Sequence, residues 1–522
     1  MPGRRPHLSV VDTSDDNPIG DRPFVNIENG KRSEAIDEAE PHLVERGNLF
    51  ERGDLIVRVA PQEIETIDGG KAEALRTVPV GNEHLRECFS QAVTLRKYDK
   101  RAAAWKPIDC PHDFAAAYLE RTGMRKLLPL AGVATSPVLR RDGSIVTRPG
   151  YDPATETYFD PRGIEFPPIP KAPTRADAGA ALERFDTLLS SLDFVDDTSR
   201  SVALSAILTP LFRRAMSAAP MHGFTAPVAG AGKSKLVNVA AILVTGHQAP
   251  VTALGQRDEE TEKRLGSVLL AGDPIIALDN AERPIGGEFL CQAITEPLIA
   301  FRILGTSSRL TVGNTACWYA TGNNLKFAGD MVRRALLCRL DPLCERPELR
   351  EFETPDPCVV ALAERPQLVI AALTIARAFL VAGCPREVAP VGSFPEWSKW
   401  VRDPLIWLGR ADPVDGLGEA RRDDPVLAAL TAIIEQWNLA LHGDRVSVSQ
   451  IVGAAGSHAD FREALLSVAG ERGEISTRRL GQYLGKVKGR TVNKRRIVPA
   501  ETVHGVARWQ LEGADTRQWS GR

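Results

Sequence analysis

The stretch His222-Gly-Phe-Thr-Ala-Pro-Val-Ala-Gly-Ala-Gly-Lys-Ser234 decides how the middle of this chain folds. A short apolar run leads into small residues, and Gly-Lys-Ser is followed by an apolar segment, 236–244. Small residues let backbone N–H groups curl around phosphates, and a helix N-terminus adds the positive end of its dipole. The pattern therefore predicts a strand, a phosphate-binding loop and a helix, in that order.

The loop supplies a set of candidate nucleotide-binding residues: Gly230, Ala231, Gly232, Lys233, Ser234 and Lys235. Lys233 would reach the β- and γ-phosphates, and Ser234 would bind Mg²⁺ through its hydroxyl. Pro227 stands where the pattern G-x-x-x-x-G-K-[ST] has its first glycine, and its fixed φ makes the loop enter differently. The competing interpretation is a glycine-rich helix cap with a solvated lysine.

A carboxylate is expected at the end of a neighbouring strand. The apolar run 274–278 ends in Asp279, which we predict to hold Mg²⁺ through water. Asn280 stands where hydrolytic relatives often have a second acid, so the base that activates water would come from elsewhere. The sequence leaves several glutamates open for that role: Glu282, Glu259, Glu260 and Glu262.

Polar residues follow a third apolar run, 316–321. It ends in Gly322-Asn323-Asn324, and Asn323 can position the attacking water against the γ-phosphate. Arg333 and Arg334 come next and suit an arginine finger, which stabilises charge on a nucleotide bound by the neighbouring subunit. The alternative for both arginines is a solvated helix face. Between the carboxylate and this run, two strand-like stretches flank Gly-Thr-Ser-Ser, with Arg302 and Arg309 on their sides.

Taken together, these motifs resemble the ATPase of phage, prophage and plasmid primase-helicase proteins, which belongs with the AAA+ ATPases and is similar to superfamily 3 helicases. The likeness rests on the order APVAGAGKS, DPIIALDN, ITEPLIAFRILGTSSRLTVGNTACWYATGNNL and GDMVRRALLCRLD. It extends to ERGNLFERGDLIVR near the N-terminus and to SFPEWSKWVR, and covers roughly residues 28–442.

This resemblance implies a ring oligomer, usually a hexamer, that uses ATP and Mg²⁺ to move along single-stranded DNA. It makes Arg302 and Arg309 DNA contacts, Asn323 the sensor, and Arg333 or Arg334 the finger. The chain has no zinc-binding cysteine set and no convincing acidic metal cluster for primer synthesis. We therefore expect a separate primase to supply primers.

The tail is basic. Residues 445–522 hold fourteen Arg/Lys and seven Asp/Glu, although the whole chain has a formal net charge of −2. Eight basic residues and no acidic ones lie between 478 and 496: Arg478, Arg479, Lys486, Lys488, Arg490, Lys494, Arg495 and Arg496. A helix over 477–486, capped by Ser476, and strands over 490–498 and 506–511 predict a winged-helix order that binds duplex DNA through phosphates. The alternative is a solvated basic surface or a docking module.

Composition fits a soluble globular protein, with 43% hydrophobic and 25% charged residues, and excludes a disordered chain. No apolar run predicts a membrane span or an export signal, so we expect a cytoplasmic protein whose eight scattered cysteines are reduced thiols.

The expected fold is α/β: an AAA+ P-loop ATPase core with a helical lid, an α+β N-terminal domain and a C-terminal winged-helix-like domain. The boundaries are a disordered tail 1–27, the N-terminal domain 28–163, a Pro-rich linker 164–176, the core 177–355, the lid 356–442 and the basic domain 443–515.

The leading functional hypothesis is an ATP-dependent DNA helicase or translocase that replicates a phage, prophage or plasmid-like mobile element. A second is an ATP-switched replication initiator or origin-binding regulator with little unwinding, which Asn280 favours. A third is a prophage remnant that binds DNA without catalysis. The intact set of Lys233, Asp279 and the two arginines argues against that third hypothesis.

Overall fold

The computed structural model describes residues 22–65, 69–253, 255, 258–302, 309–349, 354–386, 388–503 and 505–513. The chain divides into two compact units. The first contains Met1–Arg283, Gly287–Leu325 and Arg334–Leu417. The second contains Pro284–Gly286, Lys326–Arg333 and Gly418–Arg522.

A parallel sheet forms the centre of the first unit. Its strands, in spatial order, are β14 (Val251–Thr252), β15 (Ile275–Leu278), β18 (Cys317–Asn323), β13 (Met221–Ala226) and β19 (Ala335–Arg339). Every residue of β13 and β15 is buried, as expected for apolar strands covered on both faces. Because the strands are parallel, the carboxyl ends of β13, β15 and β18 meet at one edge. The expected α/β sheet is confirmed.

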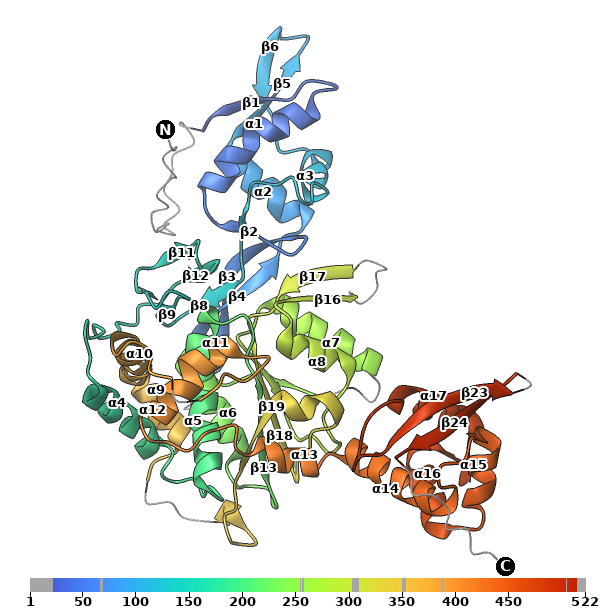
Figure 1. The fold of residues 1–522 in the computed structure, drawn as a ribbon. Coiled ribbons are helices and arrows are strands. Elements are labelled where there is room, and N and C mark those ends of the chain that lie inside the picture. Colours follow the sequence, from blue (N-terminus) through green and yellow to red (C-terminus); the bar gives the residue numbers. More distant parts are fainter. Residues whose placement is uncertain are drawn as a thin grey trace, which may run out of the picture. The chain divides into compact units, whose positions relative to one another are not determined.

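Helices cover both faces of this sheet. α5 (Asp197–Phe212) and α6 (Lys233–Thr245) lie on one side, with α7 (Asp258–Ala271) and α8 (Glu288–Thr295) on the other (Figure 1). The hairpin of β16 (Leu298–Arg302) and β17 (Arg309–Gly313) is antiparallel, and Arg302 pairs with Arg309. The two strand-like stretches of the sequence are therefore confirmed as a hairpin.

The N-terminal part mixes helices and short sheets. Helices α1 (Arg32–Glu45), α2 (Asn82–Ala92) and α3 (His112–Leu119) accompany a sheet of β1 (Phe24–Asn26), β5 (Thr94–Asp99) and β6 (Ala104–Pro107). A second sheet has the order β4 (Lys71–Pro79), β3 (Leu55–Glu65), β2 (Leu49–Arg52), β7 (Leu128–Pro129). The third contains β11 (Gly150–Asp152), β12 (Thr157–Phe159) and β8 (Gly132–Ala134). β9 (Val138–Leu139) and β10 (Ile145–Val146) pair as an antiparallel hairpin on either side of Asp142-Gly143, a dipeptide typical of such turns.

Two buried arginines join these N-terminal strands to the core. Arg52 donates to the carbonyls of Leu269 (2.9 Å) and Leu270 (3.1 Å) near the end of α7. Arg365 donates to the carbonyl of Val244 (2.9 Å) at the end of α6 and to the hydroxyl of Thr135 (2.8 Å). A cation at a helix C-terminus satisfies carbonyls that lack partners within the helix and complements the helix dipole.

Residues 161–174 form neither helix nor strand, as the prolines there predict. α4 (Arg175–Leu188) then begins with a capping box between Thr174 and Asp177. After the sheet come α9 (Pro357–Ala363), α10 (Arg365–Val381), α11 (Pro395–Trp397), a π-helical turn over Ser398–Arg402 and α12 (Asp403–Trp407). Trp397 and Trp400 are buried in this helical segment.

The second unit contains the basic tail, residues 445–522. Its helices are α14 (Pro425–Ala440), α15 (Val448–Ala455), α16 (Ala459–Ala469) and α17 (Thr477–Val487), preceded by α13 (Leu417–Arg422). Its three-stranded sheet has the order β20 (Val446–Ser447), β24 (Val506–Glu512), β23 (Arg496–Val503), and β21 (Gly470–Glu471) pairs with β22 (Glu474–Ile475). Trp437 of α14 lies in the same core as Leu480 and Ile497. The structure thus groups α14 with the tail, whereas the sequence boundary at 442/443 placed it in the lid.

The tail strands differ in one respect from the prediction. The helix over 477–486 and its Ser476 cap are confirmed. The first strand, however, was expected from Arg490 and begins only at Arg496. Asn493 and Lys494 adopt positive φ values of 48° and 65°, so the chain turns there before the strand starts.

Among the described residues, no single helix has the length and apolar composition needed to cross a membrane. α9 and α10 reach that length and composition only as a pair, across a bend of 86°.

Candidate functional site

The loop between β13 and α6 leaves the start of the helix open. Gly230 and Gly232 have φ values of 77° and 91°, which residues with a Cβ rarely adopt. A Cβ on Gly232 would also lie 2.5 Å from a methyl carbon of Leu192. Gly232 is the N-cap of α6, and among the described residues no side chain caps this helix end. The N–H of Lys235 donates to the carbonyl of Gly232 at 3.1 Å, so the anion-binding features of this helix start are the N–H groups of Lys233 and Ser234 and the positive dipole end.

Lys233 connects this loop to the neighbouring strand. Its ammonium lies 2.8 Å from the carbonyl oxygen of Val228 and 2.8 Å from the amide oxygen of Asn323. Partial burial lowers the pKa of Lys233, and the carboxylate of Asp279 partly opposes this shift. The structure brings the predicted Lys233, Asp279 and Asn323 together at the carboxyl ends of three adjacent strands, where ligands of open α/β sheets bind.

Ser234 and Asp279 place a hydroxyl oxygen beside a carboxylate oxygen. The hydroxyl of Ser234 lies 3.4 Å from a carboxylate oxygen of Asp279. A hydroxyl beside a carboxylate suits Mg²⁺, which prefers hard oxygen ligands and keeps several waters. These two residues therefore fit the ion that the sequence implies.

Thr321 orients this carboxylate and was missed by the sequence analysis. Its hydroxyl donates to Asp279 and accepts the backbone N–H of Asn280 at 3.1 Å. The available signal was its place in β18, two residues before Asn323. The register between β18 and β15 decides which polar side chain reaches Asp279. The sequence alone does not give that register.

The structure does not single out the catalytic base. Asn280 has a φ of 50° and directs its N–H to Thr321. Glu282 is exposed after β15. The other three candidates, Glu259, Glu260 and Glu262, lie in α7, where Glu260 pairs with Arg264. Pro227 is exposed directly after β13.

The side chain of Lys235 forms an ion pair and does not reach the phosphate loop as that of Lys233 does. Its ammonium lies 3.0 Å from the carboxylate of Asp356, the N-cap of α9. The side chain of Asp356 also accepts the N–H of Cys358 at 2.8 Å. The side chain of Lys235 therefore fastens the first turn of α6 to α9, and its backbone N–H donates to the carbonyl of Gly232 at 3.1 Å. Neither group is directed to the nucleotide, unlike the sequence-based assignment of Lys235.

Arg333 and Arg334 lie in different surroundings. Arg334 is half-buried and donates to the carbonyl of Cys291 (2.7 Å) and to the hydroxyl of Thr295, both in α8. Arg333 is exposed and pairs with Asp330 in the same 3-10 turn, Gly329–Arg333. Because a finger must reach another subunit, exposure favours Arg333.

The hairpin candidates cannot be placed by their side chains. Arg302 ends β16 and Arg309 begins β17, but their side chains and residues 303–308 lie outside the described part of the chain. β16 packs on α7, where Phe301 lies against Gly266.

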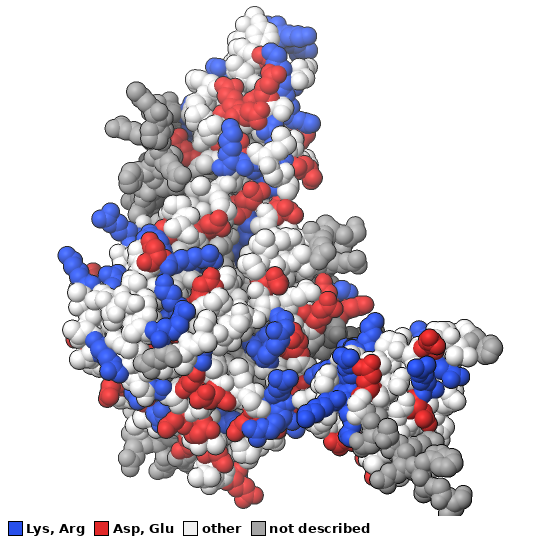
Figure 2. All heavy atoms as spheres, in the orientation of Figure 1, with Lys and Arg blue, Asp and Glu red and all other residues white. Residues whose placement is uncertain are grey.

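The basic residues of the tail divide into paired and unpaired cations. Arg479 pairs with Glu471 (3.6 Å), Arg490 with Asp424 (3.6 Å) and Arg496 with Glu512 (2.6 Å), while Arg495 donates to the carbonyl of Gly513 (3.3 Å). Among the described residues, the remaining four are exposed and form no ion pair: Arg478, Lys486, Lys488 and Lys494. Figure 2 shows basic and acidic side chains intermixed on this unit.

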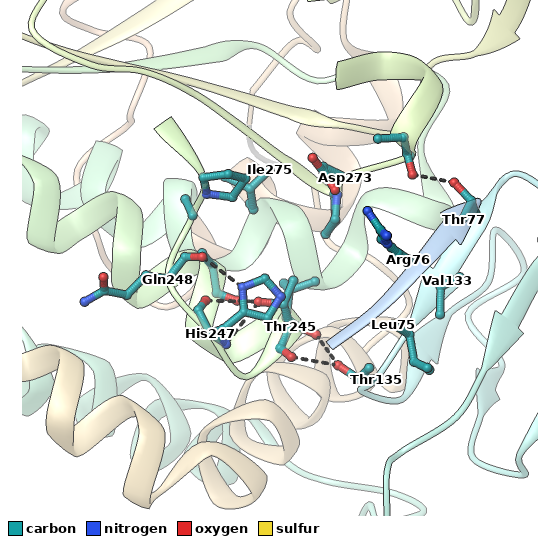
Figure 3. Close-up of a pocket in the computed structure, with 17 residues that line it drawn as sticks. Leu75, Arg76, Thr77, Val133, Thr135, Thr245, His247, Gln248, Asp273 and Ile275 are labelled. Carbon is teal, nitrogen blue, oxygen red and sulfur yellow. Dashed lines mark hydrogen bonds between the residues drawn. The ribbon is translucent and has the colours of Figure 1, made fainter. Parts of the chain in front are cut away.

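A separate cavity lies where the N-terminal strands meet the core (Figure 3). His247 and Asp273 line it, and burial lowers the pKa of His247 and raises that of Asp273. Its walls include the end of α6 and Ile275 at the start of β15. The cavity is therefore at the edge of the sheet opposite the phosphate loop and does not belong to the Lys233 site.

No protein-family model matches this chain, and no curated protein matches it. Among solved structures, the apo C-terminal region of NrS-1 is similar over 82% of this chain and 98% of its own, at 11% identity and a TM-score of 0.33. The JCV helicase is similar over 50% of this chain and 71% of its own, at 12% identity and a TM-score of 0.21. The SCCmec type IV Cch helicase is similar over 81% and 93%, at 11% identity and a TM-score of 0.30. These TM-scores are too low to carry an argument about this chain.

Proposed function

We propose that this protein is an ATPase that moves along DNA as a helicase or translocase for the replication of a phage, prophage or plasmid-like mobile element. The observation that carries the ATPase is the meeting of Lys233, Ser234, Asp279 and Asn323 at one sheet edge, beside an uncapped helix start. This arrangement supplies a cation and N–H donors for phosphates, oxygen ligands for Mg²⁺ and a polar amide for water.

Each residue has a defined part in hydrolysis. Lys233 binds the β- and γ-phosphates, and Ser234 and Asp279 hold the magnesium ion, which neutralises charge on the phosphates when it is bound. Asn323 orients the attacking water, and the exposed Arg333 serves as the finger to a neighbouring subunit. A ring, with six subunits as the expected number, places that arginine at the next nucleotide.

The DNA part of the proposal rests on charge and on the resemblance of the sequence. Arg302 and Arg309 belong to a hairpin that would contact the translocated single strand. The exposed cations of the tail, on and after a helix that is followed by the antiparallel strands β23 and β24, suit winged-helix contacts with duplex phosphates. Primers come from a separate primase in this proposal.

The experiment is ATP hydrolysis by the purified chain with and without single-stranded DNA. We expect stimulation by DNA, and loss of hydrolysis in Lys233→Ala. Lys263→Ala is the matched control, because Lys263 is exposed on α7 and outside the site. Hydrolysis that persists in Lys233→Ala would overturn the assignment of this site.

A nucleotide-switched initiator is the second candidate, and Asn280 favours it. An amide cannot take the proton of an attacking water as a carboxylate can, so hydrolysis would be slow and binding would act as an assembly signal. Strand displacement on a forked substrate separates the two. ATP-dependent displacement supports the motor, whereas ATP-dependent assembly on duplex DNA without displacement supports the initiator.

A further inference from the structure

The three-stranded sheet β1-β5-β6 is covered on one face only. Val25 and Leu95 point to the side where α1, α2 and α3 pack, and both are buried in a shared core with Phe89 and Phe114. In an extended strand successive side chains alternate between the two faces. The residues on either side of Val25 and Leu95 therefore face away from the helices.

Aromatic side chains occupy this outer face where polar ones are expected. Register pairs Phe24 with Thr94 and Tyr98 with Trp105, so Phe24, Tyr98 and Trp105 share the face with Arg96. Phe24 is 57% exposed and Tyr98 47% exposed, and Trp105 is half-buried. A solvated sheet face normally alternates to polar residues, and exposed large apolar groups indicate binding.

The aromatic rings are held in place by their neighbours. The guanidinium of Arg96 lies 4.1 Å from the centre of the Phe24 ring, and its Nε donates to Asn26 at 3.2 Å. Tyr98 and Trp105 meet edge to face, with ring centres 5.6 Å apart. Since Tyr98 lies four residues along β5 from the partner of Phe24, the two groups are separated by about 13 Å. The face thus presents two fixed aromatic groups, Phe24 stacked with Arg96 and Tyr98 packed against Trp105.

Positively charged residues surround these two aromatic groups. Residues 94–107 contain five basic residues and one acidic residue, Asp99. Asp99 is neutralised by Lys106 at 2.6 Å and caps the turn by accepting the N–H of Arg101 at 2.9 Å. Lys97, Lys100 and Arg101 are exposed. Figure 2 shows lysine and arginine side chains gathered at the β5–β6 hairpin.

We propose that this outer face, formed by Phe24, Arg96, Tyr98 and Trp105, binds single-stranded nucleic acid by stacking unpaired bases. Aromatic rings beside cations recognise a strand through base stacking and phosphate charge, without reading its sequence. A duplex does not satisfy the face, because its bases are already stacked and paired. The site is separate from the Lys233 site and goes beyond the proposed function, since it gives the N-terminal part its own hold on an unpaired strand.

The test measures binding of the full chain to fluorescein-labelled oligothymidylate without nucleotide. We expect Tyr98→Ala and Trp105→Ala each to weaken binding by a factor of about 5 to about 150. Met124→Ala is the control, because Met124 is 71% exposed in the same part of the chain but outside the three strands. Basal ATP hydrolysis should match the parent chain, which shows that the variants fold. Failure of the ATPase proposal would leave this nucleotide-free measurement intact.

Charge and position provide the second readout. Lys100→Glu/Arg101→Glu should reduce the slope of log affinity against log salt by about 1.4 for single strands, and Lys126→Glu should not. Photocrosslinking with 4-thiothymidine DNA should label peptides that contain Tyr98 or Trp105. Equal losses for oligouridylate assign the face to unpaired strands of either sugar, and a loss for oligothymidylate alone assigns it to DNA. Unchanged affinity, with no crosslink here, would overturn the proposal. Dissociation of an oligomer by Tyr98→Ala, with strand affinity intact, would overturn it in favour of a protein interface.

Discussion

The ammonium of Lys233 donates a 2.8 Å hydrogen bond to the amide oxygen of Asn323, which ties the phosphate loop to the end of the adjacent strand. Asn323 thus lies where an amide can orient water beside a phosphate that Lys233 binds. We expect Asn323→Ala to lower kcat for ATP hydrolysis by about 100-fold, the effect of removing one positioned polar group.

Nucleotide affinity should change little in Asn323→Ala, since Lys233 and the helix start remain. Steady-state hydrolysis and binding of a fluorescent ATP analogue separate the two quantities. A loss of affinity as large as the loss of kcat would mean that Asn323 holds Lys233 in place rather than water.

Thr321 should act on magnesium through Asp279. Thr321→Val keeps the shape but removes the hydroxyl that donates to the carboxylate, and such supporting groups are worth about 10- to 100-fold in metal affinity or activity. Hydrolysis titrated with Mg²⁺ should therefore need a higher concentration for half-maximal rate. Thr321→Ser should restore the parent curve. A Thr321→Val curve that overlays the parent would show that Asp279 needs no such support.

Substitutions of the two arginines after β18 should have different effects on the melting temperature. Arg334→Ala removes hydrogen bonds to α8 and should lower the melting temperature, whereas Arg333→Ala should not, because Arg333 is exposed. Arg333→Ala should instead slow hydrolysis by about 1,000-fold or more, as expected for a finger. Mixing Arg333→Ala with Lys233→Ala subunits should restore part of the activity, since some interfaces then combine an intact site with an intact finger. No recovery on mixing would argue against a finger supplied in trans.

His222 should make the first unit sensitive to acid. It is buried in β13 with Nε2 3.0 Å from the hydroxyl of Ser205, and burial lowers its pKa from 6.5 to about 3. Protonation then favours the unfolded chain, so stability is full above about pH 6.5 and falls as the pH drops toward 3. Between about pH 7.5 and about pH 5.5 the loss is on the order of 1 kcal/mol.

The measurement for His222 is the urea midpoint followed by tryptophan fluorescence at both pH values. His222→Gln does not titrate in this range and should show a smaller shift than the parent chain. Equal shifts in the two proteins would assign the acid sensitivity to other groups.

The sequence predicted the features that strand order dictates and missed those that depend on pairing across the chain. Lys233, Asp279 and Asn323 could be brought together in advance because carboxyl ends of parallel strands meet at one edge. The role of Thr321 depends on the register of β18 with β15. The aromatic face forms because β1 pairs with β5, about seventy residues further along the chain. No local sequence pattern predicts that pairing. Arg333 and Arg334 are neighbours in sequence but differ in burial and in their hydrogen-bond partners, which composition does not encode.

The tail should bind duplex DNA mainly through its unpaired cations. Lys486 is exposed in the last turn of α17, and Lys488 is exposed directly after the helix. Within the described residues neither lysine has a carboxylate partner. Lys486→Ala/Lys488→Ala should weaken duplex binding and reduce the slope of log affinity against log salt by about 1.8, because each lysine neutralises one phosphate. Arg472→Ala, an exposed arginine in the turn before β22, is the matched control. ATP hydrolysis without DNA should be equal in all three proteins. A salt slope that stays the same in the double variant would place the duplex contacts on another surface and leave the tail as a docking module.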